Sequence, residues 1–170
     1  AFLHKTFTLM EAQSNSIIQL QIQNILNSTE ERLFKSVEIA EDICIDSSLS
    51  QKNMKEYGFH TLAGMENLRR YEEQIGIDII LFLAYQDDFI VSKSGTCRTS
   101  TFINDDLKFT EESKELFLEI VNSKEAFSGC VLEQRTGDKY LFFFFYYPEN
   151  EYVEEKKVGF LFKERGFEKD

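Results

Sequence analysis

The chain contains no tryptophan, only one proline, and just eight glycines, three cysteines and two histidines in 170 residues. Three cysteines cannot build a disulfide framework, and a chain of this length can bury a core without one. No stretch approaches the roughly 18 to 20 apolar residues of a membrane-spanning helix, and the start lacks the basic and apolar regions of a signal peptide. At this length, with 42% hydrophobic and 29% charged residues, residues 1–170 are expected to form a single domain.

Positive charge is scarce as well. Lysine and arginine total 19 against 30 aspartates and glutamates, which gives a net charge of -11. Such a chain repels phosphate backbones and anionic lipid headgroups, so nucleic acid is excluded as a partner of this chain. The chain also begins with Ala1, inside what reads as a helix, and we therefore expect it to be a soluble piece of a longer protein.

Motifs of enzymatic chemistry are missing too. His4 and His60 lie far apart in the sequence, and no zinc-protease, glycine-rich phosphate or nucleophile-elbow pattern is present. Asp87 and Asp88 are adjacent carboxylates, but their place between two apolar runs favours a solvated turn over a catalytic pair. We expect no enzymatic activity, no bound metal and no cofactor.

A long amphipathic helix is predicted over residues 7–44, which contain neither glycine nor proline. Its apolar residues recur at helical spacing, at Ile18, Ile22, Ile25, Leu33, Val37, Ala40 and Cys44. At ~1.5 Å per residue this helix would be about 57 Å long, more than a domain of this size needs to cover its core. We expect its first half, rich in glutamine and asparagine, to project, and residues 33–44 to pack on the core.

The rest of the domain, residues 59–170, begins with a second predicted helix over residues 61–74. Its buried side is marked by Leu62, Met65 and Leu68. Gly76, just past its end, is a candidate C-terminal cap. A third helix is predicted to begin after Thr110, which has the side chain of an N-cap.

Five strands are predicted from runs of apolar and aromatic residues. Two of them form a hairpin, and three lie in the last third of the chain, so that the set is 77–85, 89–94, 129–135, 140–147 and 157–162. Residues 96–110 are polar and read as a long irregular loop, a feature that is often functional. Residues 142–145 are four consecutive phenylalanines, so their strand is expected to be central and covered on both faces. The order of the elements predicts an α+β fold with an antiparallel sheet.

Three segments, together with the long N-terminal helix, carry a family resemblance: residues 79–92 (IILFLAYQDDFIVS), 137–145 (GDKYLFFFF) and 159–162 (GFLF). On these the chain resembles a Cache domain, the PAS-like extracytoplasmic sensor module of bacterial membrane receptors, and is most similar to the sensors of transmembrane AraC-type regulators and sensor histidine kinases of Firmicutes. The resemblance implies a five-stranded antiparallel PAS-like sheet, with the long helix on one face and a small-molecule pocket on the other. It also implies a membrane span on each side of this chain and a location on the extracytoplasmic face of the cell membrane.

Ligand-binding residues are expected where that resemblance places the pocket. The candidates are Arg98, Lys93, Ser92, Tyr140, Tyr146 and Tyr71. In the family the loop that holds Arg98 folds over the pocket, and a guanidinium there could hold a carboxylate. The alternatives are an exposed arginine and aromatic rings that only fill the core. The Arg, Trp, Tyr and Asp set by which amino-acid-binding members hold their ligand is not found, which leaves the ligand class open.

Two further expectations concern cross-links and self-association. Cys97 and Cys130 could form a disulfide outside the cytoplasm, or stay free, since the sequence does not show whether their Cα atoms lie within the roughly 4.4 to 6.8 Å of a bridge.

A weak homodimer is expected through the N-terminal helix. Its seam would be Ile18, Ile22, Ile25 and Leu33, with the spacing of a short coiled coil.

The function predicted from these features is that of an extracytoplasmic sensor domain of a histidine kinase or an AraC-type regulator. Binding of an unidentified small molecule or protein would shift the population of two helix arrangements, and the N-terminal helix would pass the shift to the membrane spans. The rival prediction is a cytosolic PAS-type domain that dimerises or binds other proteins without any ligand.

Overall fold

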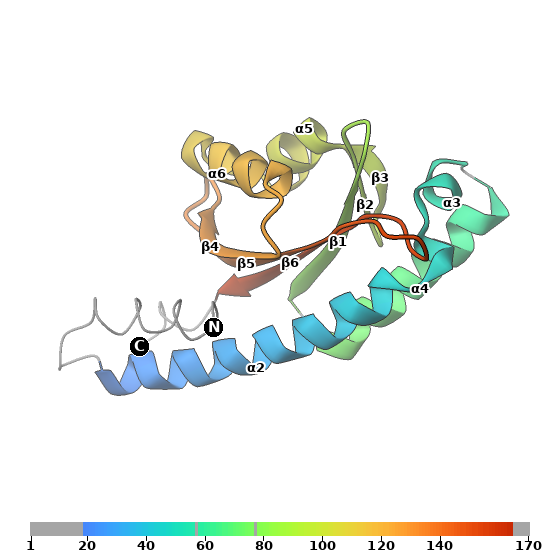
Figure 1. Ribbon diagram of the computed structural model, residues 1–170. Helices are drawn as coiled ribbons and strands as arrows, with labels where there is room; N and C mark the ends of the chain where they lie inside the picture. The colour runs from blue at the N-terminus through green and yellow to red at the C-terminus, as the bar shows by residue number, and fades with distance from the viewer. Residues whose placement is uncertain (1–18, 57, 77, 165–170) are drawn as a thin grey trace.

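The structure, a computed structural model, describes residues 19–56, 58–76 and 78–164, with side chains from Thr29 onward (Figure 1). Its helices are α2 (Gln19–Cys44), η1 (Ser47–Leu49), α3 (Gln51–Lys55), α4 (Phe59–Ile75), α5 (Thr99–Thr101), the π-helical turn η2 (Phe102–Asp106) and α6 (Glu111–Asn122). Its strands are β1 (Ile79–Tyr85), β2 (Phe89–Ser92), β3 (Gly95–Arg98), β4 (Phe127–Glu133), β5 (Lys139–Tyr147) and β6 (Lys156–Glu164). The predicted α+β class is confirmed. Residues 7–18 of the predicted long helix lie outside the described residues.

The strands form one antiparallel sheet in the order β3-β2-β1-β6-β5-β4. The five predicted strands are all present, but the count of five is wrong, because β3 adds a sixth strand at the edge beside β2. The prediction of an irregular loop over residues 96–110 is also wrong, since this stretch holds most of β3 together with α5 and η2. The polar sequence of β3 lacks the alternation of apolar and polar residues by which a strand is predicted. As an edge strand with mostly half-buried residues, β3 forms without that alternation.

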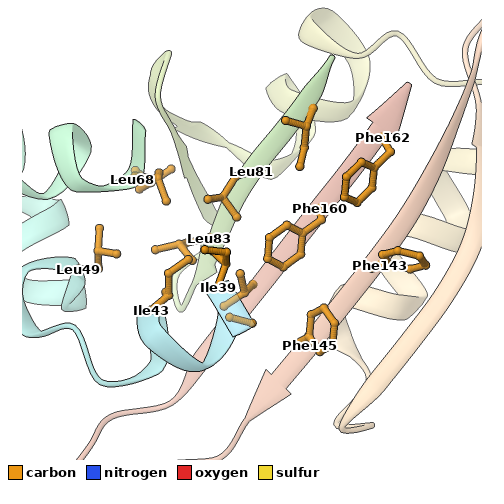
Figure 2. Close-up of a cluster of buried hydrophobic side chains, with 14 of the residues drawn as sticks. Ile39, Ile43, Leu49, Leu68, Leu81, Leu83, Phe143, Phe145, Phe160 and Phe162 are labelled. Carbon is orange, nitrogen blue, oxygen red and sulfur yellow. The ribbon is translucent and has the colours of Figure 1, made fainter. Parts of the chain in front are cut away.

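Both faces of the sheet are covered, as the run of phenylalanines in β5 predicted. Phe142 and Phe144 are 0% exposed on one face, and Phe143 and Phe145 are 4% exposed on the other. The second face packs against α2, η1, α3 and α4. Figure 2 shows side chains of α2, η1 and α4 facing those of the strands. The first face packs against α5, η2 and α6. Each face therefore has its own hydrophobic core, as strict alternation along the strands requires.

The second half of α2 lies along the sheet, as its apolar spacing predicted. Its buried residues are Thr29, Leu33, Ser36, Ile39, Ala40 and Ile43. The helix contacts β5 and β6, and Arg32 forms an ion pair with Glu164 at the end of β6, with 2.9 Å between the guanidinium and the carboxylate. This packing holds the long helix against the C-terminal strand.

Helix α4 is present where the sequence predicted it, and Met65 and Leu68 face the core as predicted, but the buried side is rotated away from Leu62. Leu68 is buried, whereas Leu62 is 69% exposed, so the prediction for Leu62 is wrong. The buried residues are Thr61, Gly64, Leu68 and Glu72. Gly64 explains the rotation, because a Cβ there would lie 2.6 Å from the carbonyl oxygen of Ser48. The helix approaches η1 through this glycine instead of through a larger apolar residue.

The structure confirms the turn and the helix start that local sequence patterns predicted. Asp87 and Asp88 form the turn of the first hairpin with φ of 67° and 62°, a conformation that aspartate tolerates. The Thr110 side chain accepts a hydrogen bond from the Ser113 amide at 3.2 Å, which confirms the predicted N-cap of α6. The short helices η1 and α3 were not predicted from the sequence.

Candidate ligand-binding site

The structure separates the two cations that the sequence suggested as ligand-binding residues. Lys93 lies in the tight turn between β2 and β3, next to Ser92. Arg98 is exposed at the far end of β3, where it pairs with Phe89. The register places Ser92 opposite Gly95, so at ~3.3 Å per residue Arg98 lies about 10 Å along the strands from that turn. Lys93 lines the cleft described below, whereas Arg98 is not among its lining residues.

The three predicted tyrosines also lie in different places. Tyr140 is buried beside α6, with its ring edge-on to Phe109 at 6.3 Å. Tyr146 shares that face of β5 but is near its other end, where a hydrogen bond to Glu155 raises the pKa of the phenol. Tyr71 lies on the opposite face of the sheet, and its hydroxyl donates to a carboxylate oxygen of Asp46 at 2.7 Å.

Ser92 and Lys93 do line a cleft, and its volume is about 570 Å³. Its walls come from α4, β1, the β2–β3 turn and the segment that begins with η2. The lining residues are Glu72, Ile80, Ser92, Lys93, Ser94, Phe102, Asp105, Asp106, Leu107 and Lys108. Four segments distant in the sequence thus meet around one hollow of the size that small ligands occupy.

A buried carboxylate, Glu72, is one of the residues that line this cleft. Its side chain is 5% exposed, and one oxygen lies 2.7 Å from the Lys93 ammonium nitrogen. The other oxygen accepts a hydrogen bond from the Leu81 amide at 2.8 Å. The pairing of β1 with β2 ends at Phe82 and Ser92, so the carboxylate replaces the missing strand partner of Leu81. Glu72 thus joins α4, β1 and the β2–β3 turn.

Sequence reasoning missed Glu72, although a signal was present. Glu72 follows Leu68 by four residues, which puts both on one side of the helix. An acid on the buried stripe of a helix needs a positive or hydrogen-bonding partner, and Lys93 supplies one. A search for such a partner would have drawn attention to the β2–β3 turn.

The turn η2 and the residues after it form another part of the cleft lining. The Leu107 amide donates to the Phe102 carbonyl at 2.9 Å, the wide spacing of a π-turn, which often occurs at functional sites. Asp105 and Asp106 are exposed here, and Lys108 is held at φ 52°. The thiol of Cys97 lies 3.9 Å from Asp106. Burial, and then this carboxylate, raise the pKa of the Cys97 thiol.

The cleft therefore contains both positively charged groups and hydrogen-bond acceptors that a small molecule can contact. Lys93 and Lys108 can bind an anionic group, while Asp105, Asp106 and two serine hydroxyls can accept hydrogen bonds. Among the described residues, no group of three His, Cys, Asp or Glu side chains is placed to hold a metal ion.

The sheet face beside the cleft is filled by aromatic rings. Phe82, Phe109, Phe117, Phe142 and Phe144 are each 0% exposed. Neighbouring ring centroids lie close together, 5.3 Å apart for Phe117 and Phe142 and 5.1 Å for Phe82 and Phe102. Phe102 belongs both to this cluster and to the cleft lining, so the cleft lies at the margin of the aromatic core.

The structure argues against a disulfide between Cys97 and Cys130. Cys97 is on β3 and Cys130 on β4, which are the two opposite edges of the sheet. Five strand spacings of ~4.8 Å separate them by about 24 Å, far beyond the reach of a disulfide. Both thiols, and that of Cys44, are free.

The predicted dimer seam needs one correction. Leu33 is 2% exposed and packs in the core between α2 and the sheet, so it is unavailable to a second chain. Ile18 lies outside the described residues, as do the side chains of Ile22 and Ile25. The seam, if it forms, is confined to residues before Thr29.

Comparisons with known proteins give no match. No family model, no curated protein and no solved structure matches the chain. Within the described residues, no helix is both long and apolar enough to cross a membrane.

Proposed function

We propose that the chain is the ligand-sensing domain of a bacterial membrane receptor, such as a histidine kinase or an AraC-type regulator, on the extracytoplasmic face of the membrane. A small polar molecule binds in the cleft beside Lys93. The observation that carries this proposal is the position of Glu72, which contacts the cleft cation and the sheet while belonging to α4. Because α4 contacts α2, a change at Glu72 has a continuous route to the N-terminal helix.

The order of the strands supports a PAS-like sheet of the Cache type. Without the edge strand β3 the order is β2-β1-β6-β5-β4, so the first hairpin lies beside the last strand. The long helix α2 lies on one face, and η2 and α6 lie on the other, where the family resemblance expects the ligand side.

The charges of the cleft favour a ligand with an anionic group and a hydrogen-bond donor. With a net charge of -11 the domain repels anions at long range, so an anionic group needs a local cation. Lys93 and Lys108 are the two cations of the cleft lining. Binding of the ligand to Lys93 competes with Glu72 for the ammonium group, and this competition is the step that shifts α4.

A thermal-shift screen of amino acids, short organic acids and neutral sugars tests the proposal. A binding compound raises the melting temperature by mass action. We expect Lys93→Met to abolish that increase, whereas Lys124→Met, at an exposed position away from the cleft, retains it. Arg98→Ala should also retain it. If the increase survives Lys93→Met, or depends on Arg98 instead, the ligand is not held in this cleft.

A second candidate function, the cytosolic PAS-type interaction domain, is favoured by one observation. The aromatic rings fill the sheet face on which a PAS-like domain would hold a ligand. If no compound in the screen raises the melting temperature and the chain forms stable dimers, this candidate replaces the first. Membrane spans encoded immediately outside residues 1 and 170 in the full gene would favour the receptor.

A further inference from the structure

A second hollow lies near the end of the sheet opposite the ligand cleft, between the C-terminal end of α2 and the loop that joins β5 to β6. We call it the end groove; its volume is about 260 Å³. Its lining residues are Cys44, Ile45, Asp46, Ser47, Ser50, Tyr152, Val153, Glu154 and Lys156. It shares no residue with the cleft beside Lys93.

Two strongly exposed apolar side chains line the end groove from different segments. Ile45 follows α2 and is 74% exposed, and Tyr152 is in the β5–β6 loop and is 85% exposed. Single exposed apolar residues are common on protein surfaces and need no explanation. Two that line the same hollow, from segments about a hundred residues apart, form a surface of the kind that interaction sites use.

The loop wall that carries Tyr152 is ordered by its own hydrogen bonds. The Asn150 side-chain oxygen accepts from the amides of Tyr152 and Val153 at 2.7 and 3.0 Å. The Asn150 amide in turn donates to the Val153 carbonyl at 3.0 Å. Tyr152 is therefore held outward on a formed loop, so binding through this ring costs little loop ordering.

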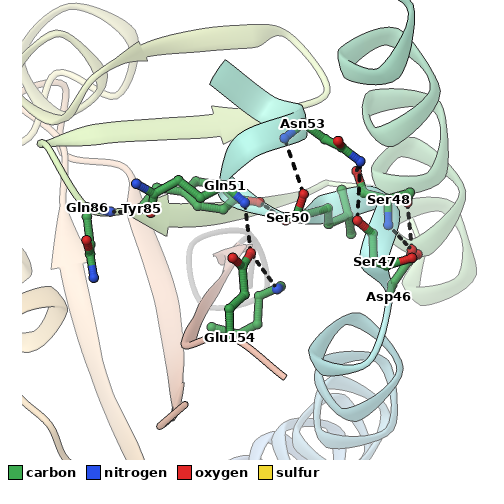
Figure 3. Close-up of polar contacts among 11 residues, drawn as sticks. Asp46, Ser47, Ser48, Ser50, Gln51, Asn53, Tyr85, Gln86 and Glu154 are labelled. Atoms are coloured by element: carbon green, nitrogen blue, oxygen red, sulfur yellow. Dashed lines mark hydrogen bonds and ion pairs between the residues drawn. The ribbon is translucent and has the colours of Figure 1, made fainter. Parts of the chain in front are cut away.

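The two walls of the groove are joined by Glu154 (Figure 3). One of its carboxylate oxygens accepts from the Gln51 amide at 2.7 Å, at the start of α3, and lies 3.1 Å from the Lys156 ammonium nitrogen. Lys156 is itself only 4% exposed. On the other wall, Asp46 accepts from the Ser48 amide at 2.9 Å and caps η1. The groove is thus formed before any partner arrives.

The charge of the groove identifies its partner. The loop of residues 149–155, which carries Tyr152, contains four glutamates and no lysine or arginine. Of these glutamates Glu154 lines the groove, and Asp46 is the second carboxylate of the lining. The one cation of the lining, Lys156, is buried and already paired with Glu154. An acidic rim around apolar side chains complements a segment with an apolar anchor and basic flanks. A second copy of this chain, with a net charge of -11, lacks that complementarity.

We propose that the end groove docks a basic segment of a partner protein through an apolar anchor side chain placed between Ile45 and Tyr152. This site goes beyond the sensor function and does not depend on it, because it shares no residue with the ligand cleft. The domain would then receive a protein signal at one end of the sheet and a small-molecule signal toward the other. Aromatic anchors such as Tyr152 commonly dominate the energy of such interfaces.

The test uses two fluorescent peptides that differ only in their centre. One has Leu-Phe flanked on each side by two lysines, and the other has Ser-Ser in the same position. Binding to the full chain is measured by fluorescence anisotropy at about 150 mM salt, where exposed charges are screened over ~8 Å. We expect the Leu-Phe peptide to bind about tenfold more tightly than the Ser-Ser peptide, which corresponds to about 1.4 kcal/mol.

Three variants locate the binding. Tyr152→Ser and Ile45→Ser should each remove most of the advantage of the Leu-Phe peptide. Phe59→Ser is the matched control, because Phe59 is 80% exposed on α4 and does not line the groove. Equal affinity for the two peptides, unchanged affinity in Tyr152→Ser, or a loss in Phe59→Ser would each overturn the proposal. It would also be overturned if sedimentation found a wild-type dimer that Tyr152→Ser dissociates, since the occupant would then be a second copy.

Discussion

Gly159 on β6 lies directly opposite Phe82 on β1, and the Phe82 ring occupies the space that a side chain at position 159 would need. A Cβ at this glycine would lie 2.2 Å from the tip of the ring. Gly159 is also paired with Phe144 on β5. Because Gly159 has no side chain, the Phe82 ring fits into the aromatic core on the α6 side of the sheet.

The first prediction is that Gly159→Ala destabilises the protein. Phe82 is fully buried, so its ring cannot move aside without displacing its neighbours, and overpacking of this kind costs about 1–3 kcal/mol. Urea denaturation measures the loss. Gly58→Ala is the control, because a Cβ there meets nothing closer than 3.9 Å. If the packing argument holds, adding Phe82→Leu to Gly159→Ala destabilises the chain by less than the sum of the two single changes.

The second prediction concerns the phenylalanine strand. Phe143→Ala and Phe144→Ala should each lower the free energy of unfolding by about 3–5 kcal/mol, because the two rings are buried on opposite faces. Chemical denaturation of both variants checks this. A cost below about 1 kcal/mol for one of them would mean that its face of the sheet is solvated.

The parts of the fold that the sequence predicted are those with a strong local signal. Four consecutive phenylalanines required cover on both faces of β5, and two aspartates between apolar runs required a turn. The strand β3 has no such signal, since an edge strand of four residues can be polar. On α4 only Leu62 was misplaced, because part of the buried side is built on Gly64 and on Glu72, whose carboxylate contacts Lys93 and Leu81.

The candidate site was predictable only in part, for a similar reason. Ser92 and Lys93 were chosen because they lie at the end of the second predicted strand, beside the loop that the family resemblance places over a pocket, and both line the cleft. Arg98 was favoured because the sequence around it read as a loop, but pairing with β2 moves it to the opposite end of the hairpin. Which residues meet at a cleft depends on strand register and on helix rotation, and neither is determined by residues close in the sequence.

The third prediction distinguishes a residue of the core within one chain from a residue of the proposed dimer seam. Leu33→Ala should lower the free energy of unfolding by about 2–5 kcal/mol at every protein concentration, because Leu33 is buried within its own chain. A seam residue behaves differently: Ile22→Glu should lower the association constant from sedimentation and leave the fold intact. A midpoint for Leu33→Ala that rises with protein concentration would contradict the assignment of Leu33 to the core.

The fourth prediction concerns the cysteines. The intact mass under non-reducing conditions should correspond to three free thiols, because Cys97 and Cys130 are on opposite edges of the sheet. Burial raises the pKa of the Cys130 thiol to about 12, so little of the reactive thiolate exists near neutral pH. We expect iodoacetamide to label Cys130 more slowly than Cys44 or Cys97, as followed by peptide mass spectrometry. Rapid labelling of Cys130 would show that β4 is more open than described.

The last prediction is a pH dependence centred on Asp46. Burial by itself would raise the pKa of this carboxyl, but hydrogen bonds from the Ser48 hydroxyl, the Tyr71 hydroxyl and the Ser48 amide, together with the Lys156 charge, outweigh it and lower the pKa. A carboxyl whose pKa is lower in the folded chain stabilises the fold above its unfolded pKa of about 3.9, and this stabilisation is lost as the pH falls through the folded value. Asp46→Asn should therefore be less stable than the wild type at neutral pH, and in urea denaturation the difference should shrink as the pH falls below the unfolded pKa and through the lower folded one. Tyr71→Phe removes one of the donors and should lose part of the same pH dependence, with an intermediate curve. A constant difference between Asp46→Asn and the wild type at all pH values would mean that the ionised carboxylate is not what joins α4 to η1.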